Sequence, residues 1–323
     1  MKTIPCTLLI VVATLFATTI PAWAQQYPSR AVRLIVPFPP GGGTDTMARA
    51  IAPKLSELLG QQVVPENRGG AGANIGAEVA AKAAPDGYTL MLATITNAIG
   101  ATLYTKLNYD LVRDFAPITR LATTPHILVV HPSVPVKTVK EFTAFAWARP
   151  GDLTYSSSGA GSAAHLAGEL FSSLTNLKMV HVPYKGGGPS MIALVGGEVS
   201  VCFATMPSAV GYVRSGRLRG IAVTTDKRSP SMPELPTIAE TGVAGYEAGS
   251  WYGLSAPAGT SKEIIARLHA ETMKVMALPD VKERLFNAGF EVVTSSPEQF
   301  AAFTRSEIQK WGKLVKATGL KAD

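Results

Sequence analysis

The chain has 323 residues, of which 46% are hydrophobic and only 16% are charged. This balance excludes a disordered chain, which would lack the apolar surface that offsets ordering entropy, and the unperiodic glycines exclude a collagen. At about 100–200 residues per domain we expect two lobes, and the dispersed net charge of +7 argues against a nucleic-acid-binding protein.

The first predicted element is a secretory signal peptide over residues 1–24. Lys2 precedes an apolar run over residues 8–20, and the segment ends in Ala-Trp-Ala at Ala24. The alternative is a membrane anchor, but this run is shorter than the ~20 apolar residues that cross a bilayer. Cleavage after Ala24 would leave 299 residues and, by removing Lys2, a charge of +6. No later stretch has the length of a membrane span, so we expect a soluble exported protein.

Strands that end in loops of glycine, serine and threonine, each followed by a helix, form a first series. The predicted strands are residues 33–37, 62–65 and 88–93. Strands and helices that alternate at this length predict right-handed βαβ units with a parallel sheet.

The helix after the first strand is the most clearly patterned. Its apolar residues are expected on one face, in the core; they are Met47, Ile51, Leu55 and Leu58. Thr44 or Asp45 is the expected N-cap. Pro53 lies inside the pattern and is expected to kink or restart the helix.

A second series begins at about residue 153. Its predicted strands are residues 153–156, 179–182, 199–204 and 218–224, and the first three run into loops that open helices. The stretch 127–133 between the two series is a candidate connection between lobes. Towards the C-terminus, Ser261 opens one predicted helix. Ser296 opens another, with proline at its first position and glutamine two residues later.

The loops suggest an anion site. In open α/β sheets the ligand crevice lies at the carboxyl ends of the strands, where these loops open helices. A helix N-terminus offers unpaired N–H groups and a partial positive charge, which suit a carboxylate or a phosphate. The alternative is that each loop is an ordinary βα turn whose glycines serve only the backbone. Arg68 and Lys185 lie in such loops, where each either contacts an anion or is solvated.

Enzyme motifs are weak in this chain. Residues 159–164 fit G-x-G-x-x-[GA], but no acidic residue follows the next strand to hold a ribose, and no P-loop is present. Ser162 and His165 share one predicted helix without a G-x-S-x-G elbow. The five histidines form no metal-binding pattern, and Cys202, the one cysteine after cleavage, is expected to be a buried small hydrophobe.

Several long motifs, in one order over residues 27–309, resemble a known family. They are residues 35–45, 66–76, 85–90, 182–186, 216–219, 235–242 and 250–253. These segments are similar to the substrate-binding proteins of tripartite tricarboxylate transporters, the Bug-type periplasmic receptors.

The resemblance implies an α/β, type II periplasmic-binding-protein fold. Two α/β lobes would be joined by two crossing strands, near residues 124–130 and 251–257, with a ligand cleft between the lobes. Lobe 1 would be discontinuous, with residues 25–125 and 251–323, and lobe 2 would hold residues 126–250. The C-terminal helices would return to lobe 1.

The resemblance also implies a function. The protein would be a periplasmic receptor that captures a small organic carboxylate by hinge closure and delivers it to a membrane permease or a sensor. It would act as a monomer, without catalysis, cofactor or metal. The alternative is an extracytoplasmic, hydrolase-like enzyme acting on a small organic acid, for which a nucleophile–base pair would have to meet at the cleft.

The ligand-binding residues implied by the resemblance come from both lobes. They are Phe38, Gly42, Gly43, Thr44, Asp45, Thr94 and Asn97 in lobe 1, and Ser158, Gly159, Ser162, His165, Tyr184, Lys185, Thr205, Met206 and Pro207 in lobe 2. Many family members have an aspartate after the strand that holds Phe203, where this chain has Ala204 and Thr205. An aspartate there can select a ligand amino group, so a simple or aromatic carboxylate is favoured over an amino acid.

Overall fold

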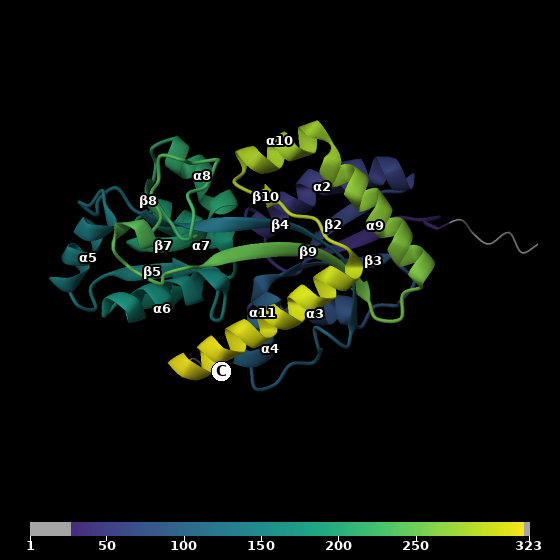
Figure 1. The fold of residues 1–323 in the computed structure, drawn as a ribbon, viewed down its shortest axis with the longest axis horizontal. Coiled ribbons are helices and arrows are strands. Elements are labelled where there is room, and N and C mark those ends of the chain that lie inside the picture. Colours follow the sequence, from purple (N-terminus) through teal and green to yellow (C-terminus); the bar gives the residue numbers. More distant parts are fainter. Residues whose placement is uncertain (1–26, 320–323) are drawn as a thin grey trace, which may run out of the picture.

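Two α/β lobes lie side by side in the computed structural model, which describes residues 27–319 (Figure 1). The predicted signal peptide lies outside these residues. Lobe 1 is on the right of Figure 1 and lobe 2 on the left, with a long strand and its neighbour running between them. Within residues 27–319 no helix has the length and hydropathy needed to cross a membrane.

Lobe 1 holds the N-terminal strands and the C-terminal helices. Its strands are β1 (Val32–Val36), β2 (Val63–Asn67), β3 (Thr89–Thr94), β9 (Gly249–Pro257), β10 (Glu291–Val292) and the first part of β4 (Phe115–Val130). Its helices are α2 (Gly43–Leu59), α3 (Asn74–Ala81), α4 (Ile95–Leu103), α9 (Lys262–Ala277), α10 (Pro279–Asn287) and α11 (Pro297–Thr318). β1 pairs in parallel with β2 and β3.

Lobe 2 repeats this arrangement with the middle of the chain. Its strands are β5 (Thr154–Ser157), β6 (Val180–Pro183), β7 (Val201–Thr205), β8 (Arg219–Val223) and the end of β4. Its helices are α5 (Val139–Trp147), α6 (Ala163–Thr175), α7 (Gly187–Val195), α8 (Met206–Arg214) and a 3-10 turn, η1 (Ala239–Thr241). β5 pairs in parallel with β6 and β7, which confirms the predicted parallel units.

β4 and β9 connect the lobes. β4 pairs with β9 up to Pro125 and then, from His126, with β7 and β8. The chain returns at Gly249, where β9 begins to pair with β4, slightly ahead of the range 251–257 expected from the resemblance. The two crossings confirm the fold class, whereas the numerical limits assigned above to the lobes remain a prediction.

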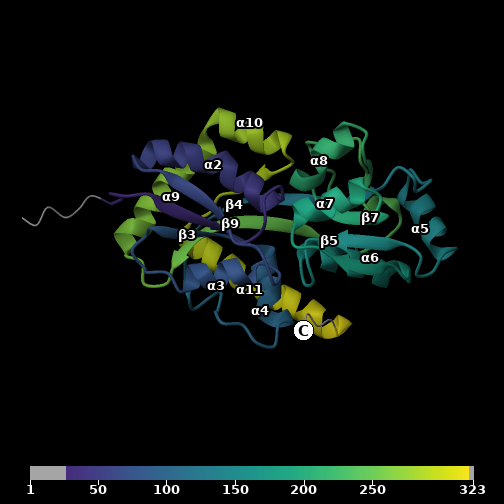
Figure 2. The same cartoon turned by 180° about the vertical axis from the view of Figure 1, so that it is seen from behind.

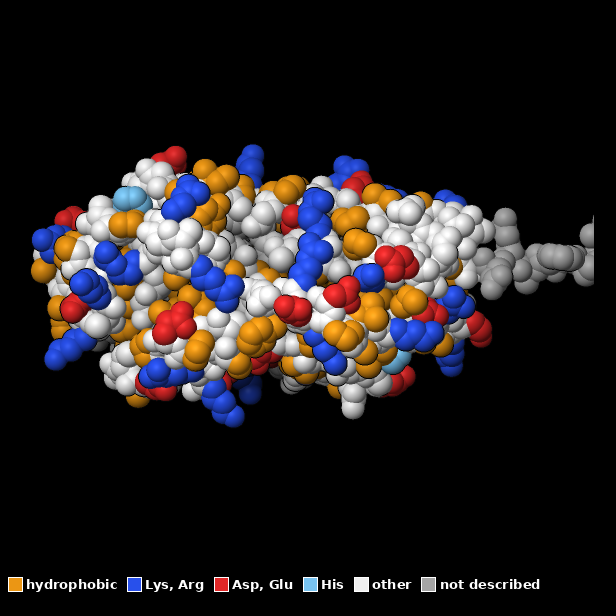
Figure 3. Space-filling view, turned by 90° about the horizontal axis from the view of Figure 1, so that it is seen from above, with side chains coloured by type: hydrophobic (Ala, Val, Ile, Leu, Met, Phe, Trp, Pro, Cys, Tyr) orange, Lys and Arg blue, Asp and Glu red, His pale blue; other side chains and the backbone are white. Residues whose placement is uncertain are grey.

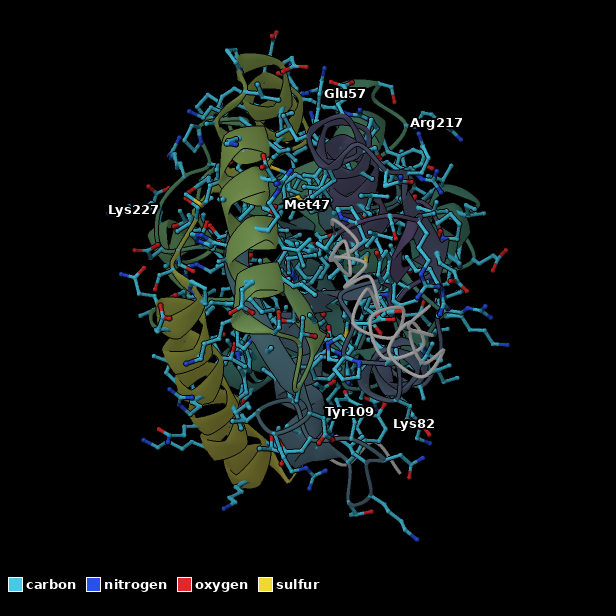
Figure 4. The ribbon with its side chains drawn as sticks, turned by 90° about the vertical axis from the view of Figure 1, so that its right-hand side faces the viewer. Met47, Glu57, Lys82, Tyr109, Arg217 and Lys227 are labelled. Atoms are coloured by element: carbon cyan, nitrogen blue, oxygen red, sulfur yellow. The ribbon has the colours of Figure 1, made fainter. Side chains whose placement is uncertain are left out.

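Helices cover both faces of each sheet, because the buried strands have apolar side chains on both sides. In lobe 1, α2, α9 and α10 pack on one face, and α3, α4 and α11 on the other, as seen from both sides of the molecule (Figures 1 and 2). Met47 lies in the first of these layers between α2 and α9, whereas Glu57 and Lys82 lie at the periphery (Figure 4). In lobe 2, α5 and α6 pack opposite α7 and α8.

The local predictions are mostly confirmed. Each predicted strand lies within two residues of an observed one, and Ser261 and Ser296 are N-caps whose side chains accept backbone hydrogen bonds. Three details differ. The N-cap of α2 is Gly42, so Thr44 and Asp45 lie inside the first turn of the helix. α2 also does not restart at Pro53, and Leu59, not the 37% exposed Leu58, completes its buried stripe.

Candidate functional site

Five helices begin around one small cavity at the junction of the lobes. They are α2 and α4 of lobe 1 and α6, α7 and α8 of lobe 2. The cavity, called the cleft here, measures about 40 Å³, which is room for a few water molecules. Its lining is Phe38, Gly42, Gly43, Thr44, Thr94, Ile95, Thr96, Ser158, Ala163, Ala164, Gly187, Thr205, Ser208, Ser250 and Tyr252.

The cleft presents neutral hydrogen-bond donors. Its lining includes eight hydroxyl-bearing residues and, within the described part of the chain, no charged side chain. The first turns of the five helices add backbone N–H groups without intrahelical partners and a partial positive charge each. Such a site stabilises an anion without a buried countercharge.

The glycines at the start of α2 allow backbone to reach the cleft. Gly42 is the N-cap and carries no side chain that would occupy the free N–H groups of the first turn. A methyl group on Gly43 would overlap the Tyr252 hydroxyl and lie 3.3 Å from Thr205 Oγ1. Position 43 therefore needs glycine, because Tyr252 of the same lobe and Thr205 of the other lobe pack closely against it.

Asp45 stabilises the loop before α2 through hydrogen bonds made outside the cleft. Its carboxylate accepts hydrogen bonds from the Gly41 amide at 3.1 Å, Arg49 Nε at 2.9 Å and Asn67 Nδ2 at 3.1 Å. Burial by itself would raise the pKa of Asp45, but these hydrogen bonds and the charge of Arg49 lower it below its ordinary value. Asp45 thus stays ionised, and it does not line the cleft.

The start of α4 contributes Thr94 and, less directly, Asn97. Asn97 Oδ1 accepts from the Thr94 amide at 3.0 Å and from Thr94 Oγ1 at 3.2 Å, as in a capping box. Thr94 lines the cleft, whereas Asn97 is fully buried outside it. Asn97 therefore positions Thr94.

In lobe 2, two stacked histidines support the loop that carries Ser158. The rings of His165 and His181 are 3.8 Å apart and nearly parallel. His165 Nδ1 accepts from the Gly161 amide at 3.1 Å, and His181 Nε2 lies 2.7 Å from Ser157 Oγ. The Ser157 hydroxyl in turn donates to the Gly159 carbonyl and accepts from its amide. His165 therefore holds the loop directly at Gly161, and His181 holds it through Ser157.

Both histidines are neutral at ordinary pH. Burial lowers the pKa of His165, and nearby Glu169 opposes this only in part. Burial and the adjacent His165 lower the pKa of His181 to about 3. The rings therefore stack without mutual repulsion.

Ser162, Met206 and Pro207 also lie beside the cleft without lining it. Ser162 caps α6 by accepting from the His165 amide at 3.3 Å. Met206 is buried, and its Sδ accepts from Ser231 Oγ at 3.1 Å. Pro207 lies in the first turn of α8, where a missing N–H costs nothing.

Gly159, Tyr184 and Lys185 line a separate, outer hollow of about 360 Å³ at the mouth of the cleft. Phe38 and Ser158 border both spaces. Lys185 is exposed. The predicted residues thus divide into a group at the cleft, a group at its mouth and a group that supports the loops.

The lobes touch across the cleft. A Cβ on Gly41 would lie 3.5 Å from Gly188 Cα, and one on Gly42 would lie 3.7 Å from the Gly187 amide nitrogen. The Tyr104 hydroxyl donates to the Ala160 carbonyl at 3.4 Å. This is a closed arrangement, which explains why the cleft is small.

Sequence reasoning missed several residues of the cleft. They are Ile95, Thr96, Ala163, Ala164, Gly187, Ser208, Ser250 and Tyr252. Most follow a predicted site residue by one or two positions, within or just after a predicted loop, so a wider window at each helix start would have found them. Ser250 and Tyr252 had only the motif at 250–253 as a signal, since their placement depends on how β9 pairs with β3 and β4.

The remaining candidate chemistries find little support. Cys202 is free and 2% exposed, as predicted, and burial raises the pKa of its thiol. Residues 27–319 contain no group of three or more His, Cys, Asp or Glu side chains arranged to hold a metal. The face seen in Figure 3 mixes acidic, basic and apolar side chains, so it offers no continuous basic surface for nucleic acid.

Comparisons with known proteins agree with this geometry. The profile of the tripartite tricarboxylate transporter family receptor matches residues 47–320. Protein BugT of Bordetella pertussis is 38% identical over 303 residues, which cover 93% of each chain. The solved structure of the periplasmic binding protein BugD superposes with a TM-score of 0.89 at 33% identity, covering 91% of this chain and 99% of that one. The structure of R. palustris Rpa4515 with adipate superposes with a TM-score of 0.88 at 38% identity, covering 91% of this chain and 99% of that one.

Proposed function

The chain belongs to the tripartite tricarboxylate transporter receptor family, and on that premise we propose that it captures a small organic carboxylate between its lobes by hinge closure. Family members and structural neighbours are solute-binding receptors and not enzymes, which sets the hydrolase-like alternative aside. The captured carboxylate would be delivered to a membrane permease or a sensor, with the protein acting as a monomer.

The observation that carries the proposal is the convergence of five helix N-termini on a cleft without charged side chains. A carboxylate would accept hydrogen bonds from the N–H groups of α2 and α4 on one side and of α6, α7 and α8 on the other. Because the donors come from both lobes, the anion would favour the closed state over the open one.

The shape of the site suggests how a ligand lies. At about 40 Å³ the cleft suits one carboxylate group, and the rest of the ligand would extend past Phe38 and Ser158 into the outer hollow. There Tyr184 offers a ring and Lys185 a cation. A straight-chain dicarboxylate or an aromatic acid fits this arrangement, in keeping with Ala204 and Thr205.

The place of action would be the periplasm, where family members work. The predicted export signal and cleavage after Ala24 accord with this. The proposed lobe limits would be residues 25–125 and 251–323 for lobe 1 and 126–250 for lobe 2.

A thermal-shift screen of the mature protein tests the function. Adipate, malate and benzoate should be compared with the amine butylamine. We expect a raised Tm for at least one acid and none for the amine, because a ligand that binds only the folded state stabilises it. No response to any acid would refute carboxylate capture.

A pair of glycine variants tests the site. Gly43→Ala should weaken acid binding strongly, because its methyl group overlaps the Tyr252 hydroxyl in the lining of the cleft and lies 3.3 Å from Thr205 Oγ1 of the other lobe. Gly211→Ala, in α8, is the matched control, since nothing lies within 4 Å of the added methyl. Equal affinities of the two variants would contradict the assignment of the cleft.

A further inference from the structure

A second cavity, of about 380 Å³, lies between the lobes where α11 meets the crossing strands. Trp251 borders this cavity and Tyr252 borders the cleft, because successive residues of a strand face opposite sides. We call this second cavity the hinge cavity. Its lining comes from α4, β4, β9, β10 and α11 of lobe 1 and from residues 225–228 and 247–248, which lie before β9 on the lobe 2 side.

Arg120 is the main polar group in the hinge cavity. Its Nε is buried and has no hydrogen-bond acceptor among the described residues. Its guanidinium lies over the Phe303 ring, with Cζ 4.4 Å from the ring centroid. Burial lowers the pKa of Arg120, which the charge of Glu307 opposes. Because Nε is inaccessible, a ligand would meet the rest of the guanidinium, which belongs to a half-buried side chain that lines the hinge cavity. A cation at that position attracts an anionic ligand.

Glu307 does not pair with Arg120. Its Oε2 accepts hydrogen bonds from Trp251 Nε1 at 3.0 Å and Trp311 Nε1 at 3.1 Å, and within residues 27–319 Arg120 forms no ion pair. The guanidinium therefore remains available. Trp251 and Phe303 stand edge to face at 5.5 Å and, with Trp311, give the cavity an aromatic wall.

The charges of the lining limit the ligand. Four cationic and four anionic side chains line the hinge cavity: Arg120, Lys227, Arg228 and Lys310 against Asp226, Glu247, Glu291 and Glu307. Arg228 is already paired with Glu240, and Lys227 lies at the outer edge of the molecule (Figure 4). A lining with equal numbers of cations and anions does not attract a multiply charged anion. The Arg120 guanidinium and the aromatic wall therefore determine which ligand the cavity selects.

We propose that the hinge cavity binds a small monocarboxylate with a flat apolar body. Its carboxylate accepts hydrogen bonds from the Arg120 guanidinium, and its body packs against Trp251 and Phe303. This second site adjoins the cleft, with which it shares Ile95 and Ser250 as lining residues, and it does not depend on the function proposed for the cleft.

The test uses the mature protein labelled with 5-fluorotryptophan and benzoate as the probe. Fluorine NMR reports on Trp147, Trp251 and Trp311, which are assigned by single Trp→Phe variants. Trp311 borders the hinge cavity and not the cleft, and Trp147 is distant and 62% exposed. We expect benzoate to shift the Trp311 signal saturably and to leave Trp147 unchanged.

Variants locate the site. Arg120→Gln should weaken benzoate binding about tenfold or more, because a charge-assisted pair is lost, and Arg120→Lys should weaken it less. Arg305→Gln, in the helix α11 that carries Phe303 but outside the hinge cavity, is the matched control. Gly43→Ala should leave the Trp311 shift intact.

Three outcomes would overturn the proposal. The first is no saturable Trp311 shift in the unmutated protein, which requires no variant. The second is equal benzoate affinity in Arg120→Gln and the unmutated protein. The third is loss of the shift in Gly43→Ala, which would assign the signal to the cleft.

Discussion

Replacing His181 with phenylalanine should change how the stability of this protein depends on pH. In the folded state His181 stacks on His165 at 3.8 Å and lies 2.7 Å from Ser157 Oγ. Burial first, and the neighbouring His165 second, lower its pKa from 6.5 to about 3. Phenylalanine keeps a ring in the stack but removes the titrating group and the hydrogen bond.

The magnitude follows from proton linkage. A histidine whose pKa is lowered on folding contributes stability that is fully present above the unfolded value of 6.5. Below pH 6.5 the histidine binds a proton in the unfolded state but not in the folded state. The free energy of unfolding therefore falls by up to about 1.4 kcal/mol per pH unit. Because His181 is partly exposed, solvent screening reduces this to roughly 0.7 kcal/mol per unit.

Urea denaturation of His181→Phe at about pH 7 and about pH 4.5 measures the effect. At the higher pH the variant should be about 1 kcal/mol less stable, since it lacks the bond to Ser157. At the lower pH this deficit should shrink by about 1–1.5 kcal/mol and so vanish or reverse. Ser157→Ala is the matched control, because it removes the same bond but no titrating group. Parallel pH profiles of His181→Phe and the unmutated protein would refute the reasoning.

Two further substitutions probe the cleft and the fold. Asp45→Asn should lower the free energy of unfolding by about 1–2 kcal/mol and weaken acid binding, because an amide cannot accept from Gly41, Arg49 and Asn67 together. Asp86→Asn, which breaks the exposed pair with Arg30, is its control, and equal losses in urea denaturation would contradict a special role for Asp45. Ser296→Ala should cost about 1 kcal/mol because it removes the N-cap of α11, measured by thermal denaturation. Ser306→Ala within α11 should cost less, and the reverse order would argue against the cap.

Most of the fold could be predicted because its signals are local. Strand runs such as 33–37 became β1, and Ser261 and Ser296 became N-caps, since capping and apolar patterning act over a few residues. Asp45 shows the limit of this approach. Its residue type suits an N-cap, yet Gly42 caps the helix, and the Asp45 carboxylate instead accepts hydrogen bonds from Arg49 and from Asn67.

The candidate site was predictable to the same degree. Loop residues such as Gly43, Thr94 and Thr205 line the cleft, because loops at the carboxyl ends of strands meet there. Asn97 and Ser162 have side chains that could bind a ligand, but their oxygens accept hydrogen bonds that cap helices. A residue type states what a side chain can bind, and only its neighbours determine what it does bind.

The sequence by itself determined the succession of strands and helices, the family, and the helix starts that suit a carboxylate. The tertiary structure alone decided that Tyr252 meets Gly43 and that the Arg120 guanidinium packs on the Phe303 ring beside the hinge cavity. The physical reason is distance along the chain. These contacts depend on the register of β4 with β9 and on the docking of α11, which no short stretch of sequence encodes.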